Sequence, residues 1–248
     1  MSLSLVSIER KDRVAFVRMN RAAKKNALSV ELIEQLYEAA QMLKKDEGTN
    51  VVILSGSPDG FSAGADRNDS RIFAPTTSVL EHWHMAEFGG EVARAWENLH
   101  QVTIAAIERF AVGGGFTLAM ACDFRVMGRS AFVTIPEVPL GFNYGWNSIP
   151  RMASLIGSSR TKRVVMFGER IPAEQAERWG LTDYVAEDGA VEGFAADLAG
   201  RLAQMPQLAV QFTKRAVNAV ANASRDISSH ADMAQIVLCL RTADKTNS

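Results

Sequence analysis

The chain has 248 residues, of which 47% are hydrophobic and 22% are charged, and its formal net charge at pH 7 is −1. A chain of this length forms one large domain or one domain with an appendage, and its composition excludes a disordered or collagen-like protein. The balanced charge excludes a whole-chain field that would attract nucleic acid or anionic lipid.

The cysteine content and the N-terminal segment indicate a compartment. Cys122 and Cys239 both lie in apolar runs and are too few for a disulfide framework, so we expect buried thiols in a reducing environment. The N-terminal segment reaches the charged residue Glu9 without the apolar core of a signal peptide, and no long apolar run follows. We therefore expect a cytoplasmic protein with no membrane partner.

The first half of the chain alternates strands with helices. Residues 13–19 alternate polar and apolar side chains, and residues 51–54 are a short β-branched run, so both are predicted strands. Ser29 can cap a helix between them. The apolar face of this helix is formed by Ile33, Leu36, Ala40 and Leu43. The same order recurs with strands at 103–107 and 124–127 and a helix from about Phe116. This alternation predicts an α/β fold.

After about residue 145 the pattern becomes helical, with one short predicted strand at 183–185. The predicted helices lie near 158–167, 172–179, 189–204, 209–223 and 227–243. No linker rich in Ser, Gly or Pro separates this tail from the first half, so we expect it to pack on the core.

Two glycine-bearing turns, at 61–66 and 112–116, follow apolar strands. Ligands of α/β folds bind at the carboxyl ends of strands, where glycines let a ligand approach backbone N–H groups. A P-loop is excluded because Phe116 and Thr117 follow the last glycine, and a dinucleotide fingerprint is excluded by Leu118. Two converging N–H groups would form an oxyanion hole, although tight structural turns would give the same pattern.

Four blocks of the sequence together resemble one family. The blocks are Phe61–Asp66, Ile104–Asp123, Ile135–Gly141 and Phe167–Val185. In order and spacing they resemble the enoyl-CoA hydratase/isomerase (crotonase) superfamily, from about residue 13 to about residue 218. The resemblance implies an α/β protein with a crotonase-like (ClpP/crotonase) ββα-superhelix core and an acyl-CoA site at 1–190. It also implies a C-terminal helical assembly region at 191–248 and a homotrimer or a hexamer built as a dimer of trimers.

The resemblance implies a role for each glycine-bearing turn. The backbone N–H groups of Ala65 and Gly114 would bind the thioester oxygen of an acyl-CoA, which gains negative charge during the reaction. The residues expected to bind substrate or CoA are Arg21, Lys24, Lys25, Ala63, Asp66, Gly113 and Lys214. For the four basic residues a solvated surface is an equal alternative. Coenzyme A is part of the substrate, so we expect no separate cofactor.

One position departs from the family pattern. Hydratases of the family carry two glutamates, and the matching positions here are Thr117 and Glu137. A threonine hydroxyl cannot accept a proton at neutral pH, so Glu137 is the only acid/base group at a family position. A single acid/base group favours 3-enoyl to 2-enoyl isomerisation or decarboxylation. Hydration of a 2-enoyl thioester and a non-catalytic acyl-CoA-binding relative remain alternatives. The near-neutral charge disfavours an RNA-binding relative.

Two further groups lie near the expected acyl pocket. One loop offers Asn143, Tyr144 and Trp146, which would narrow the pocket or supply a donor, or else pack beneath the tail. His82 and His84 fall where the family has a variable helix or loop. They cannot face each other on a helix and lack a third ligand, so no metal site is expected. Either could replace the missing glutamate, but surface histidines are the simpler interpretation.

Overall fold

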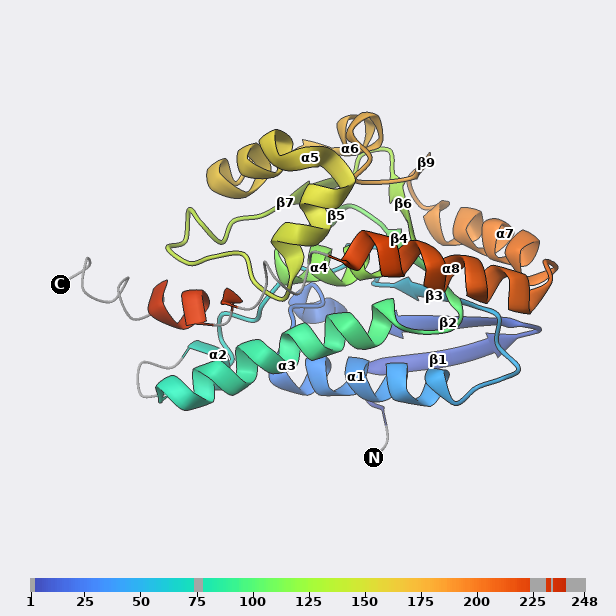
Figure 1. Ribbon diagram of the computed structural model, residues 1–248, viewed down its shortest axis with the longest axis horizontal. Helices are drawn as coiled ribbons and strands as arrows, with labels where there is room; N and C mark the ends of the chain where they lie inside the picture. The colour runs from blue at the N-terminus through green and yellow to red at the C-terminus, as the bar shows by residue number, and fades with distance from the viewer. Residues whose placement is uncertain (1–2, 74–77, 224–230, 233, 240–248) are drawn as a thin grey trace.

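The computed structural model describes residues 3–73, 78–223, 231–232 and 234–239. Its main sheet has the strand order β1-β2-β3-β4-β6-β9, in which only the β1–β2 pair is antiparallel among the described residues (Figure 1). A second sheet has the order β5-β7-β8. The strands are β1 (Val6–Lys11), β2 (Val14–Met19), β3 (Val51–Ser55), β4 (Val102–Ile107), β5 (Phe110–Val112), β6 (Phe124–Gly128), β7 (Phe132–Thr134), β8 (Ile171–Pro172) and β9 (Tyr184–Ala186).

Helices cover both faces of the main sheet. They are η1 (Ala22–Lys24), α1 (Val30–Lys44), α2 (Ser70–Phe73), α3 (Val79–Glu97), α4 (Gly114–Ala121), α5 (Ser148–Phe167), α6 (Ala173–Trp179), α7 (Val191–Ala203) and α8 (Gln207–Asn222). Helices α1 and α3 pack side by side, and α7 packs against β2, β3, β4 and β6 (Figure 1). In β3, Val52 and Leu54 belong to one hydrophobic cluster and Val51 and Ile53 to the other, so the strand is buried on both sides.

The predicted α/β class is confirmed, and so are the predicted strands in β2, β3, β4, β6 and β9. Ser29 caps α1, since its hydroxyl accepts the Leu32 N–H. The prediction missed β1, whose last three residues are exposed and charged, and it reduced the long helix α3 to a variable segment. It found only the second half of α5, because Gly157, with φ 78°, interrupts the helical backbone there.

The C-terminal helices divide between the sheet and the surface. Helix α7, which is the first part of the predicted assembly region, supplies Val191, Ala195 and Ala199 to the second hydrophobic cluster and so packs on the sheet. Helix α8 has no buried residue. Residues 234–239 are helical, and the rest of the predicted helix at 227–243 lies mostly outside the described residues. Within the described part, none of the helices has the length and apolarity to cross a membrane.

Candidate active site

The turn after β3 is held against the chain before α1. The Leu28 N–H donates to Gly64 O at 2.7 Å, and the Asp66 N–H donates to Leu28 O at 3.0 Å. Leu28 and Ala65 thus form a parallel bridge, in which Gly64 and Asp66 are bonded to Leu28 and Ala65 lies between them. In such a bridge the N–H of the middle residue points to the side opposite the paired segment. The Ala65 N–H therefore points away from Leu28, and Ala65 lines a cavity.

The turn after β5 lies directly beside it. A Cβ built on Gly64 would lie 3.7 Å from the backbone nitrogen of Gly114. Gly114 is the first residue of α4, where backbone N–H groups have no partner within the helix. Gly113 caps α4 with φ 48° and ψ −122°, and a Cβ there would overlap the Glu137 carboxylate. Position 113 therefore requires glycine both for its backbone conformation and for the close approach of Glu137.

The Glu137 carboxylate is the buried acid of this site. Its Oε2 atom is buried and has no hydrogen-bond partner among the described residues. Burial raises the pKa of Glu137 to about 7, against the opposing effect of hydrogen bonds from its own backbone N–H and that of Gly114. A carboxylate with a pKa near the working pH is suited to take up and return a proton. In this conformation Glu137 lies directly at the N–H expected to bind a substrate oxygen.

Three buried hydroxyls occupy the space around position 117. Thr117, Tyr144 and Ser148 are each at most 1% exposed. Thr117 Oγ1 lies 3.0 Å from Tyr144 Oη and 2.7 Å from Ser148 Oγ. Burial raises the pKa of the Tyr144 phenol, and the charge of Glu137 raises it further, so Tyr144 remains protonated. No carboxylate of the described residues joins this hydroxyl cluster, which is defined here as Thr117, Tyr144 and Ser148.

These groups surround one small cavity of about 110 Å³. Its lining is mainly apolar and includes Ile33, Ile72, Met85, Ala86, Phe142 and Ile236, together with Ala65, Gly114, Thr117 and Glu137. The Trp146 indole forms one wall. It lies against α3 at Gly89, where a Cβ would overlap the ring, and it approaches the start of α4. Trp146 therefore narrows the cavity, as one of the two interpretations of the sequence predicts.

The C-terminal segment fixes the loop that carries Trp146. Asp232 Oδ2 accepts the Asn147 N–H at 3.0 Å, and Asn143 Nδ2 donates to Gln235 Oε1 at 2.8 Å. Trp146 itself has φ 59°, a left-handed conformation that is uncommon for a bulky residue. The loop on both sides of Trp146 therefore contacts the tail, and the interpretation that Trp146 itself packs beneath the tail stays a prediction.

The two histidines of α3 differ in position. His82 lines the cavity with Glu137, whereas His84 is exposed. Within the described residues, no three acidic, cysteine or histidine side chains are grouped so that they could hold a metal ion.

Five of the expected CoA-binding residues lie at or beside the first turn. The Ala63 N–H donates to Lys25 O at 3.0 Å, and Arg21 forms an ion pair with Asp66 at 2.7 Å. Lys24, the last residue of η1, and the adjacent Lys25 are both exposed. The cationic rim predicted for this turn therefore consists of two exposed lysines and one arginine that is already paired.

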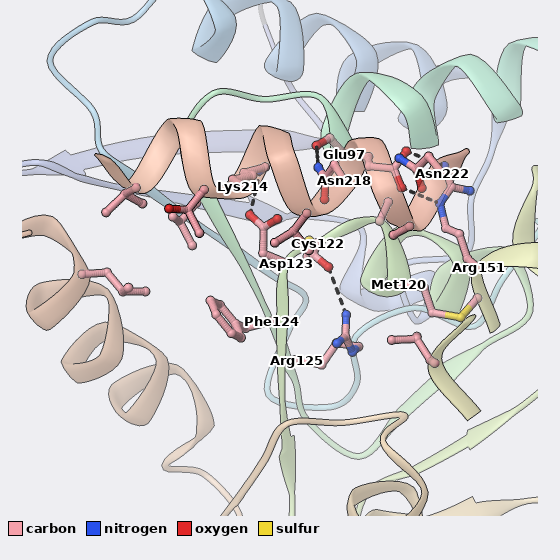
Figure 2. Close-up of a pocket in the computed structure, with 18 of the residues that line it drawn as sticks. Glu97, Met120, Cys122, Asp123, Phe124, Arg125, Arg151, Lys214, Asn218 and Asn222 are labelled. Carbon is pink, nitrogen blue, oxygen red and sulfur yellow. Dashed lines mark hydrogen bonds and ion pairs between the residues drawn. The ribbon is translucent and has the colours of Figure 1, made fainter. Parts of the chain in front are cut away.

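Lys214 is not brought to this rim. It lies on α8, and its amine pairs with Asp123 Oδ2 at 2.7 Å and donates to Gln101 O at 2.7 Å, as Figure 2 shows for Asp123. Asp123 follows the far end of α4, and eight helical residues separate that end from Gly114 by about 12 Å. The Lys214 side chain is only 7% exposed, so the ion pair, and not a phosphate, satisfies its charge in this conformation.

Comparison with known proteins identifies the family. The model of the enoyl-CoA hydratase/isomerase family matches residues 9–245. The chain belongs to this family. It is 30% identical over 246 residues to the crotonyl-CoA hydratase of Syntrophomonas wolfei, covering 99% of this chain and 93% of the relative. It is 31% identical over 219 residues to the short-chain-enoyl-CoA hydratase of Clostridium acetobutylicum, covering 88% and 82%.

Solved structures agree with the family assignment. The enoyl-CoA hydratase of Bacillus anthracis superposes with a TM-score of 0.83 at 29% identity, covering 95% of this chain and 90% of that one. The enoyl-CoA hydratase/isomerase family therefore accounts for the fold, and the predicted crotonase-like core is confirmed.

Two features of this family member were missed in the sequence. Ser148 gave no signal, because its contact with Thr117 joins residues 31 positions apart. Gly89 and Gly90, two adjacent glycines within a helix, do carry a signal, since a glycine inside a helical pattern can mark a close approach. Here the approaching group is the Trp146 indole.

Proposed function

We propose that this enoyl-CoA hydratase/isomerase family member moves a proton at carbon 2 of a short acyl-CoA thioester. The observation that carries the proposal is the position of Glu137, a buried carboxylate with a pKa of about 7 beside the N–H of Gly114. Coenzyme A arrives with the substrate, and no other cofactor takes part. The exposed Lys24 and Lys25 are proposed to meet the CoA phosphates.

The chemistry needs an oxyanion hole as well as a base. When the Glu137 carboxylate removes a proton from carbon 2, the electron pair moves onto the thioester oxygen. The N–H groups of Ala65 and Gly114 are proposed to bind that oxygen, replacing Glu137 at Gly114 in the process. A fixed donor of this kind contributes about 10²–10³ in rate.

Isomerisation of a 3-enoyl to a 2-enoyl thioester is the reaction that this site supports best. Glu137 takes the proton from carbon 2, the double bond moves, and the protonated carboxyl returns the proton to carbon 4. One acid/base group is sufficient for this sequence. The buried hydroxyl cluster at position 117 offers neither a second base nor exposed surface for an attacking water.

Hydration of a 2-enoyl thioester is the second candidate. Both relatives described above are named hydratases, and His82 lines the same cavity as Glu137. A histidine can act as an acid or a base near neutral pH, so it could serve in place of a second carboxylate.

Steady-state assays of the full chain with short 3-enoyl-CoA and 2-enoyl-CoA substrates separate these reactions. We expect isomerisation to be the faster activity and to be lost in Glu137→Gln, with a His82→Gln variant nearly unchanged. Faster hydration that is lost in His82→Gln would favour the second candidate. Tight calorimetric binding of butyryl-CoA with no turnover by either assay would indicate a non-catalytic acyl-CoA-binding protein.

We also propose that the chain assembles as a trimer or a hexamer through α8. Its apolar side chains are exposed, with Phe212 at 60%, Val217 at 60% and Val220 at 81%. Such a face is typical of an interface. Analytical ultracentrifugation should give at least a trimer at micromolar concentration, whereas a monomer would refute the proposal.

A further inference from the structure

The hydroxyl cluster ends on the peptide unit that supplies one of the proposed oxyanion donors. Tyr144 Oη donates to Gly113 O at 3.2 Å. The same carbonyl accepts the Thr117 N–H at 3.0 Å, which is the first hydrogen bond of α4. Gly113 O and the Gly114 N–H belong to one peptide plane and point in opposite directions. The groups that hold Gly113 O therefore also set where the Gly114 N–H points.

The direction of each hydrogen bond in the cluster follows from its end point. A carbonyl oxygen can only accept, so the Tyr144 hydroxyl hydrogen is directed to Gly113 O. Tyr144 Oη then accepts from Thr117 Oγ1 at 3.0 Å. Thr117 Oγ1 also lies 3.5 Å from Gly113 O, but its contact with Tyr144 Oη is shorter and takes the hydroxyl hydrogen, so Ser148 donates to Thr117 across their 2.7 Å contact. The three hydroxyls form one chain that runs from Ser148 to Gly113 O.

A chain of this kind polarises the group at its end. Successive hydrogen bonds of one direction strengthen one another in a low-dielectric interior, and all three side chains are at most 1% exposed. Bonds to a peptide carbonyl withdraw electron density from its unit and make the N–H on the other side a better donor. That N–H already contacts the Glu137 carboxylate, so it faces the cavity.

We infer that Tyr144 is a positioning residue that, with Thr117 and Ser148, orients and polarises the Gly114 N–H toward the oxygen of the bound thioester. The hydroxyls thus have a function of their own at the site where the family's hydratases carry a glutamate. They act on the oxyanion donor and do not transfer the substrate proton. This inference rests on the proposed acyl-CoA function.

The test uses an enoyl thioester whose absorption reports polarisation of its carbonyl. We would bind 2,4-hexadienoyl-CoA, a conjugated thioester with a short six-carbon acyl chain, to the full-length wild type and to Tyr144→Phe, which keeps the ring and removes the hydroxyl. The red shift of the bound probe should be smaller in Tyr144→Phe. With substrate, kcat should fall about tenfold while KM stays within about twofold, because the donor is weakened and not removed.

Two further variants make the result specific. Ser148→Ala removes the first donor of the chain without touching Gly113, and it should reduce the red shift less than Tyr144→Phe does. Tyr184→Phe is the control, since Tyr184 packs with the hydrophobic cluster on the other face of the sheet, and its red shift and kcat should equal those of the wild type.

The outcomes separate this inference from the proposed function. Wild-type red shift and kcat in a folded Tyr144→Phe would overturn the positioning role and leave the proposed function intact. If Tyr144→Phe does not fold, an unchanged red shift in Ser148→Ala overturns it equally. A wild type that binds the probe without any red shift, or does not bind it, would refute the oxyanion hole and with it both proposals.

Discussion

The two ends of α4 bury ionisable groups in opposite ways. At its N-terminal end, Glu137 has a buried oxygen without a hydrogen-bond partner among the described residues, and its pKa is raised to about 7. At its C-terminal end, Asp123 Oδ2 accepts from Lys214 Nζ, the Thr103 N–H and the Thr103 hydroxyl. A carboxylate paired with a cation stabilises the fold, whereas a carboxylate held only by two backbone N–H groups and with a pKa near neutral marks a candidate site of chemistry.

The C-terminal end contains further paired charges. Arg125 lies 2.7 Å from Asp183, and Arg151 lies 3.3 Å from Glu97, both with arginine side chains only 4% exposed. A larger cavity of about 660 Å³ beneath α8 is lined by Arg125, Arg151, Glu97 and Lys214, among others (Figure 2). Its volume would favour this cavity over the one beside Glu137, but its charged side chains form ion pairs within the protein. The smaller cavity at the other end of α4 has the titratable group.

Removal of the Glu137 carboxylate should have the largest effect on activity. Glu137→Gln keeps the shape of the side chain and removes the base, so kcat should fall by about 10²–10⁴. Thermal unfolding should show a protein at least as stable as the wild type, because a buried charge without a full set of partners is lost. Residual activity above one tenth of the wild type would assign the base to another group.

The pH dependence of stability should expose the same contrast. The folded-state pKa of Glu137 is raised from 4.5 to about 7, so the folded protein binds the proton more tightly than the unfolded chain does. The stabilising effect of this proton is complete below pH 4.5 and is lost as the pH rises through 7. The loss is about 3 kcal/mol, from about 1.4 kcal/mol per pKa unit.

Denaturant unfolding of wild type and Glu137→Gln at pH 5 and pH 8 measures this effect. The variant should gain stability relative to the wild type as the pH rises. In parallel, kcat/KM of the wild type should fall about tenfold per pH unit below pH 7, since only the carboxylate is a base. A pH-independent difference in stability between the two proteins would contradict the raised pKa.

A substitution at the C-terminal end of α4 should reduce stability and leave activity nearly unchanged, the reverse of the effect expected for Glu137→Gln. Lys214→Met retains an unbranched side chain of similar length but removes the ammonium group, so the Asp123 carboxylate loses its cation. Because loss of one partner of this partly buried pair leaves the other charge uncompensated, we expect a loss of about 2 kcal/mol in the free energy of unfolding. The KM for acyl-CoA should stay within about twofold, because Lys214 lies away from the proposed rim.

Lys24→Met is the matched control, since Lys24 is exposed beside the first glycine-bearing turn. It should leave stability within about 0.5 kcal/mol of the wild type and raise KM several-fold. If Lys214→Met instead raised KM at unchanged stability, the sequence prediction that Lys214 binds CoA would be correct.

This contrast also explains which parts of the site were predictable. The family spacing predicts Ala65, Gly114 and Glu137 together. In the structure Gly114 and Glu137 follow the paired parallel strands β5 and β7, and the turn that carries Ala65 is bridged to β5. The interpretation of Lys214 could not be settled in the same way. A lysine on an amphipathic helix shows its charge in the sequence but not its partner, and Asp123 is 91 positions away. The hydroxyl cluster is a similar case, since its contacts span 27 to 31 residues.

The fold follows the same distinction between local and long-range information. The strands of the sheet interior were predicted because they are apolar on both sides, as in β3 and β4. The edge strand β1 lacks this signal and depends on its pairing with β2. Helix α3 was underestimated because its contact with Trp146 requires Gly89, and glycine lowers the helical signal.

The smallest of these effects concerns the wall of the cavity. Trp146 lies between Gly89 of α3 and Gly114 of α4, so its indole limits the space beside Glu137. Trp146→Ala should raise kcat/KM for substrates with acyl chains of eight or more carbons relative to four-carbon ones by about tenfold, which corresponds to burial of about two further CH₂ groups at roughly 0.8 kcal/mol each. Assays of kcat/KM across a series of acyl chain lengths measure this change. The raised pKa of Glu137 should decrease in the same variant, because water entering the widened cavity would solvate the carboxylate. A shift in chain-length preference without a lower apparent pKa would show that the indole limits space but does not shield the base.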